Sequence, residues 1–231
     1  MLYWKSLHTR QFNSTMKKDT YRLIEITAVF LTVVGKLIYD NYQDQKSIIA
    51  AVIIAFWVGY IVIRRITKKG LFKHWGFTKT NFRPAIICVG IVGAILICGI
   101  ITYGLVRHNA KFNVNILKAI PLYIIWGLVQ QFIFISLFAG NLKDLEKIEI
   151  DKFLIVAITS ILFSALHTSN DALVIVTSFM AIFCTFIFLK YRNLFPLGIF
   201  HGVVGAVFYY FALNEDPWAE LITSIWSKIC T

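Results

Sequence analysis

The stretch YIIWGLVQQFIFISLF, residues Tyr123–Phe138, decides the class of this chain. It is an apolar run without a charged residue, and it contains two adjacent amides, Gln130 and Gln131. Two further apolar runs each contain a histidine: LIVAITSILFSALH ends at His167, and LFPLGIFHGVVGAVFYYFAL includes His201. Polar side chains are costly at membrane depth, so such residues indicate a functional site. We expect these four side chains to face one another, because separate positions facing lipid would leave each without a hydrogen-bond partner.

The composition places these runs in a membrane. Of the 231 residues, 58% are hydrophobic and 15% are charged, whereas a soluble domain has about 25% charged residues. We predict an all-α fold, a polytopic helical bundle in the membrane with seven to eight transmembrane segments. The expected segments are Leu23–Tyr39, Ile48–Ile63, Pro84–Val106, Ile116–Phe138, Phe153–His167, Ala172–Leu189 and Leu194–Leu213, with Trp218–Ile229 as a shallow eighth span or an interfacial helix.

Charged residues within and beside the first span have a plainer interpretation. Glu25 and Lys36 lie near opposite ends of Leu23–Tyr39. Such side chains can extend to the membrane interface, so we interpret them as positional rather than catalytic. Residues 1–22 are predicted to be a basic cytoplasmic segment, and residues 23–231 a single membrane domain.

The positive charge of the chain indicates its orientation. The formal net charge is +11, and residues 64–83 (RRITKKGLFKHWGFTKTNFR) contain seven Lys or Arg and no acid. A basic loop between spans is typical of the cytoplasmic side. We therefore expect a multi-pass protein, of the plasma membrane, with a cytoplasmic N-terminus. The same loop could recruit anionic lipids of the bilayer, and we expect no nucleic-acid partner.

Helical spacing indicates which residues accompany the polar ones. Phe163 lies on the same helical face as His167, since positions four apart are neighbours. Two histidines on separate spans suit a divalent metal such as zinc, which would make His167 and His201 its candidate ligands. Catalytic zinc needs a further ligand. The candidates are the glutamine carbonyls, Asn170 and Asp171.

A structural interpretation of the same residues remains open. Intramembrane histidines and glutamines also form hydrogen bonds that join helices. Gly198, Gly202 and Ala206 form a stripe of small residues beside His201, which we interpret as a helix-packing surface.

The order QQFIFI, FSALH, HGVVG, with the approach YRNLFPLGIFHG, resembles the CAAX prenyl protease and bacteriocin-processing (CPBP, Abi) family. The resemblance covers roughly residues 116–210 and implies a multi-span intramembrane metallo-endopeptidase. The family pattern is Glu-Glu-xxx-Arg, then Phe-xxx-His, then His-xxx-Asn/Asp. Phe163, His167 and His201 match it.

Other positions depart from this pattern. Gln130 and Gln131 stand where the family has two glutamates, Ile135 where it has arginine, and Gly205 where it has Asn or Asp. The resemblance implies that the first glutamate is the general base, and an amide cannot take up a proton in that role. Asp171 is the acid nearest to His167 in sequence and the obvious replacement base.

These observations leave three functions open. The first is a peptidase that cleaves membrane-anchored or prenylated polypeptides with an atypical site formed by Gln130, Gln131, His167 and His201. Phe163, Ile135, Gly205 and Asp171 would line its pocket. The second is a non-catalytic relative, a pseudoenzyme that binds a peptide or a partner membrane protein. An unrelated transporter or scaffold is the third.

Overall fold

The computed structural model describes residues 2–41, 46–108, 113–168, 170–220 and 222–223. It is 84% helical, and the described residues contain no strand, which confirms the predicted all-α class. The chain divides into two compact units, which are described separately below. One comprises Met1–Gly76 and Phe132–Arg192, and we call it unit 1; the other, unit 2, comprises Phe77–Gln131 and Asn193–Thr231.

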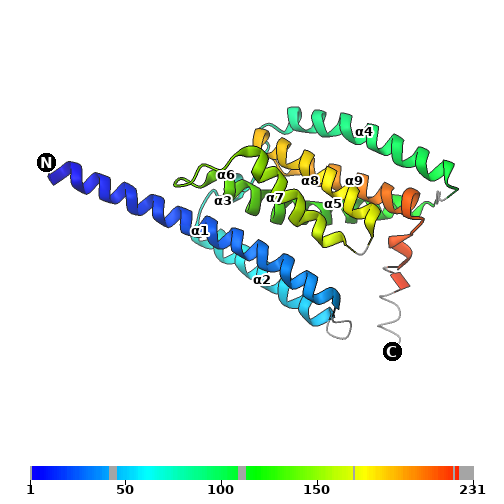
Figure 1. Cartoon of the computed structure of the whole chain (residues 1–231), viewed down its shortest axis with the longest axis horizontal. Coiled ribbons are helices and arrows are strands. Elements are labelled where there is room, and N and C mark those ends of the chain that lie inside the picture. The colour runs from blue at the N-terminus through cyan, green and yellow to red at the C-terminus, as the bar shows by residue number, and fades with distance from the viewer. Residues whose placement is uncertain (1, 42–45, 109–112, 169, 221, 224–231) are drawn as a thin grey trace. The chain divides into compact units, whose positions relative to one another are not determined.

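Unit 1 is built from long helices and short connecting turns (Figure 1). Its elements are α1 (Leu2–Asn41), α2 (Lys46–Thr67), α3 (Leu71–His74), the π-helix η2 (Phe132–Gly140), α6 (Asn141–Asp144), α7 (Lys152–Ser164), the 3₁₀ turn η3 (Ala165–His167) and α8 (Asp171–Tyr191). Asp151 and Asn170 start α7 and α8, because their side chains accept hydrogen bonds from the backbone N–H groups of the first turn.

Unit 2 consists of α4 (Phe82–Val106), α5 (Asn115–Gln131), α9 (Phe195–Phe208) and the π-helix η4 (Tyr209–Leu213). Close contact between α5 and α9 depends on glycine. A Cβ added at Gly202 would lie 2.4 Å from the backbone of Ile124, and one at Gly198 would lie 2.9 Å from the Leu128 side chain. The predicted small-residue stripe is therefore a packing surface, as glycine lets the two backbones approach.

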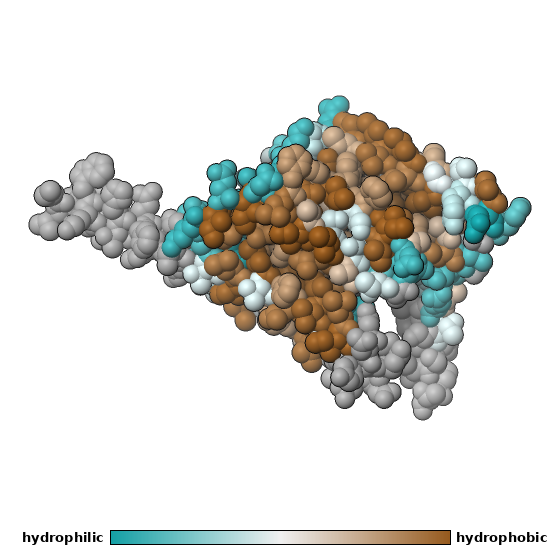
Figure 2. Space-filling view, viewed as in Figure 1, coloured by the Kyte–Doolittle hydropathy of each residue, from teal (hydrophilic) through white to brown (hydrophobic). Residues whose placement is uncertain are grey.

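Four helical segments are long and apolar enough to cross a membrane: Phe82–Val106, Asn115–Asp144, Asp171–Tyr191 and Phe195–Leu213. Lys152–His167 is apolar but shorter. The exposed surface is also apolar, and Ile87, Ile91 and Ile95 repeat every four residues along one exposed face of α4. Figure 2 shows hydrophobic residues over much of the visible surface. The chain is therefore an integral membrane protein, while the predicted count of seven to eight spans is not confirmed.

Several expected boundaries change in the structure. The predicted span Leu23–Tyr39 is the second half of α1, which already begins at Leu2. Most of the predicted segment Trp218–Ile229 lies outside the described residues.

Candidate functional site

Gln131 and His201 form a hydrogen-bonded pair inside unit 2. Gln131 is the last residue of α5 and is completely buried, and His201 lies in α9 with 8% of its surface exposed. The amide nitrogen Nε2 of Gln131 lies 3.1 Å from Nδ1 of His201. Gly127, one turn earlier in α5, makes room for the imidazole, because a Cβ there would lie 3.0 Å from Cδ2 of His201. Helix packing thus fixes both side chains of the pair.

The hydrogen bond joins Nε2 of Gln131 to Nδ1 of His201, and the role of the ring nitrogen depends on the tautomer. With the amide nitrogen on this side Nδ1 accepts, whereas an amide turned by 180° would accept from Nδ1–H through Oε1. Oε1 is buried without a hydrogen-bond partner among the described residues. The pair therefore contains one unsatisfied buried acceptor.

The zinc site that the sequence suggested stays a prediction, because its candidate ligands His167 and His201 lie in separate units. A histidine binds zinc through a ring-nitrogen lone pair. At His201, Nδ1 is engaged with the Gln131 amide. The described residues also contain no group of three or more His, Cys, Asp or Glu that could hold a metal ion. The residues present therefore favour a polar site formed by amides and imidazole.

Gln130 and Gly205 complete the predicted residues of unit 2. Gln130 is half-buried, so it is less enclosed than its neighbour Gln131. A Cβ added at Gly205 would lie 3.5 Å from the Tyr123 ring, which is an ordinary contact distance. The position could therefore hold a small side chain, and glycine there is not required by packing.

Phe163 and His167 lie in unit 1 and share one helical face, as predicted. Their ring centroids are 5.5 Å apart, and His167 Nδ1 lies 3.2 Å from the carbonyl oxygen of Phe163. Since a carbonyl only accepts, Nδ1 of His167 carries a proton and donates. In the neutral ring of His167 the lone pair is then on Nε2.

Unit 1 also holds Ile135 and Asp171. Ile135 is completely buried in η2, and Asp171 is exposed at the start of α8. An arginine at position 135 would need a buried anionic partner, because an unpaired charge in an apolar interior is strongly unfavourable. The predicted convergence of Gln130, Gln131, His167 and His201 involves both units and stays a prediction.

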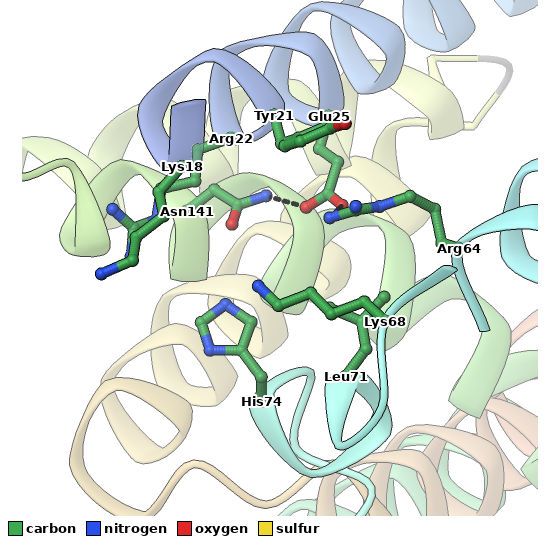
Figure 3. Close-up of a pocket in the computed structure, with 9 residues that line it drawn as sticks. All are labelled: Lys18, Tyr21, Arg22, Glu25, Arg64, Lys68, Leu71, His74 and Asn141. Atoms are coloured by element: carbon green, nitrogen blue, oxygen red, sulfur yellow. Dashed lines mark hydrogen bonds and ion pairs between the residues drawn. The ribbon is translucent and has the colours of Figure 1, made fainter. Parts of the chain in front are cut away.

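A buried carboxylate outside the predicted site is the main feature that the sequence reasoning missed. Glu25 is 3% exposed, so its carboxylate is enclosed by the protein, and its interpretation as a positional residue near the membrane interface stays a prediction. Its carboxylate accepts a hydrogen bond from Asn141 Nδ2 and lies 3.5 Å from Arg64 Nη2 (Figure 3). It also accepts a hydrogen bond from Tyr60 Oη. A glutamate within an apolar run was the sequence signal for a buried carboxylate. The residue spacing within that run could not indicate its partners, which lie 35 and 116 residues away in the chain.

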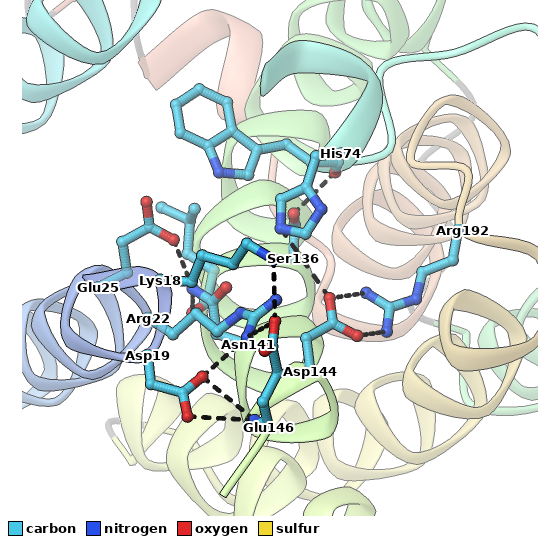
Figure 4. A network of polar contacts seen from close by, with 12 residues as sticks. Lys18, Asp19, Arg22, Glu25, His74, Ser136, Asn141, Asp144, Glu146 and Arg192 are labelled. Carbon is cyan, nitrogen blue, oxygen red and sulfur yellow. Dashed lines mark hydrogen bonds and ion pairs between the residues drawn. The ribbon is translucent and has the colours of Figure 1, made fainter. Parts of the chain in front are cut away.

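Further polar contacts surround this carboxylate in unit 1 (Figure 4). Asp144 forms a two-pronged ion pair with Arg192, with one contact at 3.0 Å, and lies 3.9 Å from His74. Burial lowers the pKa of His74, and nearby cations lower it further against the opposing effect of Asp144. His74 is therefore neutral at neutral pH.

Asp19 joins α1 to the segment after α6. Its carboxylate accepts hydrogen bonds from the backbone N–H groups of Glu146 and Lys147. It also forms an ion pair with Arg22, whose Nη1 lies 2.8 Å from Oδ1 of Asp19. Burial alone would raise the pKa of Asp19, but these donors together hold that pKa below its usual value.

The comparison with known families agrees with this arrangement of motifs. Residues 111–207 match the family model described as Rce1-like, type II CAAX prenyl endopeptidase Rce1-like. Residues 111–207 of this membrane protein are therefore similar to the CAAX protease-like family. The match includes Gln131, His167 and His201 and confirms the resemblance predicted from the sequence. Neither curated proteins nor solved structures gave a match.

Proposed function

We propose that this CAAX protease-like membrane protein binds a membrane-anchored or prenylated polypeptide and does not hydrolyse it. The Gln131–His201 pair is the observation that carries the proposal. General-base catalysis contributes about 10²- to 10⁴-fold to a reaction rate. An amide cannot act as that base, because it does not take up a proton at neutral pH.

The unsatisfied oxygen of Gln131 supports binding of a peptide. Oε1 is buried and has no hydrogen-bond partner in the described part of the chain. Leaving such an atom unpaired costs about 1–3 kcal/mol. A polypeptide within a membrane has backbone N–H groups that need acceptors, because the hydrocarbon offers none. A hydrogen bond from one such backbone N–H group to Oε1 of Gln131 would give both the N–H group and the oxygen a partner.

The residue at position 135 supports a neutral site as well. Ile135 is fully buried where the family resemblance implies arginine. Replacing glutamates by glutamines at 130 and 131 and arginine by isoleucine removes the charges as a set. Such a set avoids unpaired buried charge and retains the shape of the pocket.

Hydrolysis with an atypical site is the second candidate, and His167 favours it. The Nδ1–H group of His167 is engaged with the Phe163 carbonyl, which leaves Nε2 as an acceptor or base. In that case the substrate would be the same prenylated or membrane-anchored polypeptide, and activity would depend on His167.

The test measures capture and cleavage of one peptide in the same sample. A farnesylated peptide with a photo-crosslinking group is added to the full-length protein in nanodiscs, and mass spectrometry quantifies the adduct and the fragments. We expect an adduct that the same peptide without the crosslinker competes away, and no fragments. Gln131→Leu should weaken capture about tenfold, since it removes the buried acceptor.

Gln130→Leu is the matched control, because it changes the adjacent but only half-buried glutamine. Equal loss of capture in both variants would contradict the role of Gln131 Oε1. Fragments that form with wild type and disappear in His167→Ala would replace the binding function with the peptidase function.

The orientation remains part of the proposal. The N-terminus and the basic residues 64–83 are cytoplasmic, at the plasma membrane, in agreement with the distribution of Lys and Arg. Labelling of Lys69→Cys with a membrane-impermeant maleimide should succeed only after the cells are opened. Labelling in intact cells would reverse the orientation.

A further inference from the structure

A basic cavity lies within unit 1, away from the Gln131–His201 pair in sequence and chemistry. Its volume is about 460 Å³, in the range of about 300–1,000 Å³ that is usual for small-molecule sites. The lining residues come from α1, α2 and its C-terminal turn, α3 and α6: Lys18, Tyr21, Arg22, Glu25, Arg64, Lys68, Leu71, His74 and Asn141. The Lys18 side chain is 52% exposed, so the cavity is open to its surroundings.

The charges of this lining favour an anion. Four side chains are cationic: Lys18, Arg22, Arg64 and Lys68. Glu25 is the lining carboxylate, and both of its oxygens already accept hydrogen bonds from Tyr60 and Asn141. Lys18 and Arg22 also share Glu146, at 3.3 and 3.4 Å. Arg64 shares Glu25 with the two neutral donors and lies 3.5 Å from it, so Lys68 contributes the cationic group least compensated by acids in the described lining.

Arg64 has the features of an anchoring residue. It is 9% exposed, and its guanidinium lies 4.4 Å from the centre of the Tyr21 ring, which fixes its plane. Its Nε atom is buried and has no hydrogen-bond partner in the described residues. Such an unsatisfied donor on a guanidinium that lines a cavity is suited to an oxyanion, because the guanidinium fork binds phosphate with two parallel hydrogen bonds.

Lys68 extends into the same cavity. It follows Arg64 by four residues, and Figure 3 shows its ammonium reaching between Asn141 and His74. No ion-pair partner for this ammonium is found within the described part of the chain. A rigid, buried guanidinium and a flexible ammonium thus reach one space from different directions.

We propose that this cavity binds a phosphate group, carried by the headgroup of an anionic lipid or by a small soluble phosphate ester. Arg64 holds two phosphate oxygens, and Lys68 neutralises the remaining charge with support from Lys18 and Arg22. This assigns a defined site to one end of the basic segment 64–83, where the sequence predicted only general attraction to the membrane surface.

The experiment uses the full-length protein and distinguishes the two sources of phosphate. Native mass spectrometry of protein released from nanodiscs that contain phosphatidylglycerol, phosphatidic acid and phosphatidylcholine measures which lipids stay bound. Isothermal titration of detergent-purified protein with glycerol 3-phosphate measures binding of a soluble ester. Retention of an anionic lipid identifies a headgroup site, and heat from the ester identifies a soluble ligand.

The neighbouring residues provide matched variants. Arg64→Gln with Lys68→Gln removes two lining charges, and Arg65→Gln with Lys69→Gln removes two charges from adjacent positions that do not line the cavity. We expect the first pair to weaken binding by about tenfold or more and the second pair to leave it within about twofold. Lys68→Gln alone changes an exposed residue, so it keeps the test valid if Arg64→Gln does not fold; it should weaken binding about threefold.

Two results would overturn the proposal. One is wild-type protein that retains no anionic lipid and gives no heat with the ester. The other is equal weakening in the two variant pairs, which would show general electrostatic attraction to the basic segment in place of a site.

Discussion

The Gln131–His201 pair and the Glu25 network handle buried polar groups in opposite ways. The contact in unit 2 joins an amide to an imidazole and leaves one amide oxygen without a hydrogen-bond partner among the described residues. The network in unit 1 contains a buried carboxylate whose hydrogen bonds and ion pair come from Tyr60, Asn141 and Arg64. The segment that matches the peptidase family thus has no carboxylate in its glutamine–histidine contact, whereas the buried carboxylate lies in α1, outside residues 111–207.

This difference separates stability from ligand binding. The Glu25 carboxylate has three partners, and removing one partner of a buried ion pair lowers the free energy of unfolding. An amide oxygen without a partner gains a hydrogen bond when a ligand with a donor group binds. We therefore expect substitutions in the network to affect folding most and substitutions in the pair to affect binding.

The largest effect is expected for Glu25→Ala. It leaves the Arg64 guanidinium buried without its anionic partner, which should lower the free energy of unfolding by about 3–5 kcal/mol. Unfolding in mixed micelles with increasing dodecyl sulfate measures this loss. Glu149→Ala, at an exposed position, is the control and should change little. Adding Arg64→Leu to Glu25→Ala should recover part of the loss, and no recovery would show that the ion pair is not its cause.

A smaller effect is expected for Gly202→Ala, which tests the packing that holds the glutamine–histidine pair. The new Cβ would lie 2.4 Å from the backbone of Ile124. Helices α5 and α9 must then separate, at a cost of about 1–3 kcal/mol. Gly205→Ala adds the same atom in an ordinary contact with Tyr123, and we expect it to be nearly neutral. The same unfolding assay compares the two, and equal losses would contradict the close approach at Gly202.

Asp19→Asn should have a still smaller effect that depends on pH. The donors around Asp19 hold the pKa of this carboxyl below its usual value of 3.8. A carboxyl with a lowered pKa stabilises the folded state above its unfolded pKa, and this contribution is lost as the pH falls through the folded value. The variant should therefore melt below wild type at neutral pH, and the difference should shrink below about pH 3.8. A difference that stays constant with pH would contradict a role for the ionised form.

The smallest expected change is a spectroscopic one. In wild type, with the amide nitrogen of Gln131 beside it, Nδ1 of His201 accepts and the proton of the neutral ring lies on Nε2. Gln131→Glu replaces this donor by an acceptor, and the proton should move to Nδ1. The ¹⁵N chemical shifts of His201 in labelled protein report the tautomer. Identical shifts in the two proteins would show that position 131 does not control it.

The sequence was sufficient for the fold class and for the local partners of the motif residues. Apolar runs predicted helices, and four-residue spacing predicted the contact of Phe163 with His167. The spacing of small residues also predicted the packing of Gly198 and Gly202 on α5. These features depend on neighbours along one helix or on composition, so periodicity could reveal them.

Other features depend on residues far apart in the chain. Glu25 was interpreted as a residue at the membrane interface, because a charge near the end of a span commonly extends there. Its actual partner Asn141 is 116 residues away, and no pattern within either segment indicates the other. The zinc prediction stays a prediction, because it joins His167 and His201, which lie in separate units.

The central claim is that the Gln131–His201 pair binds and does not catalyse. Its most direct test is the turnover of a farnesylated, membrane-anchored peptide by the purified wild-type protein with zinc supplied, measured beside His201→Ala. We expect no turnover above that of His201→Ala, because neither Gln130 nor Gln131 can take up a proton as a general base. Wild-type turnover that is lost in His201→Ala, with the fold intact, would contradict the claim.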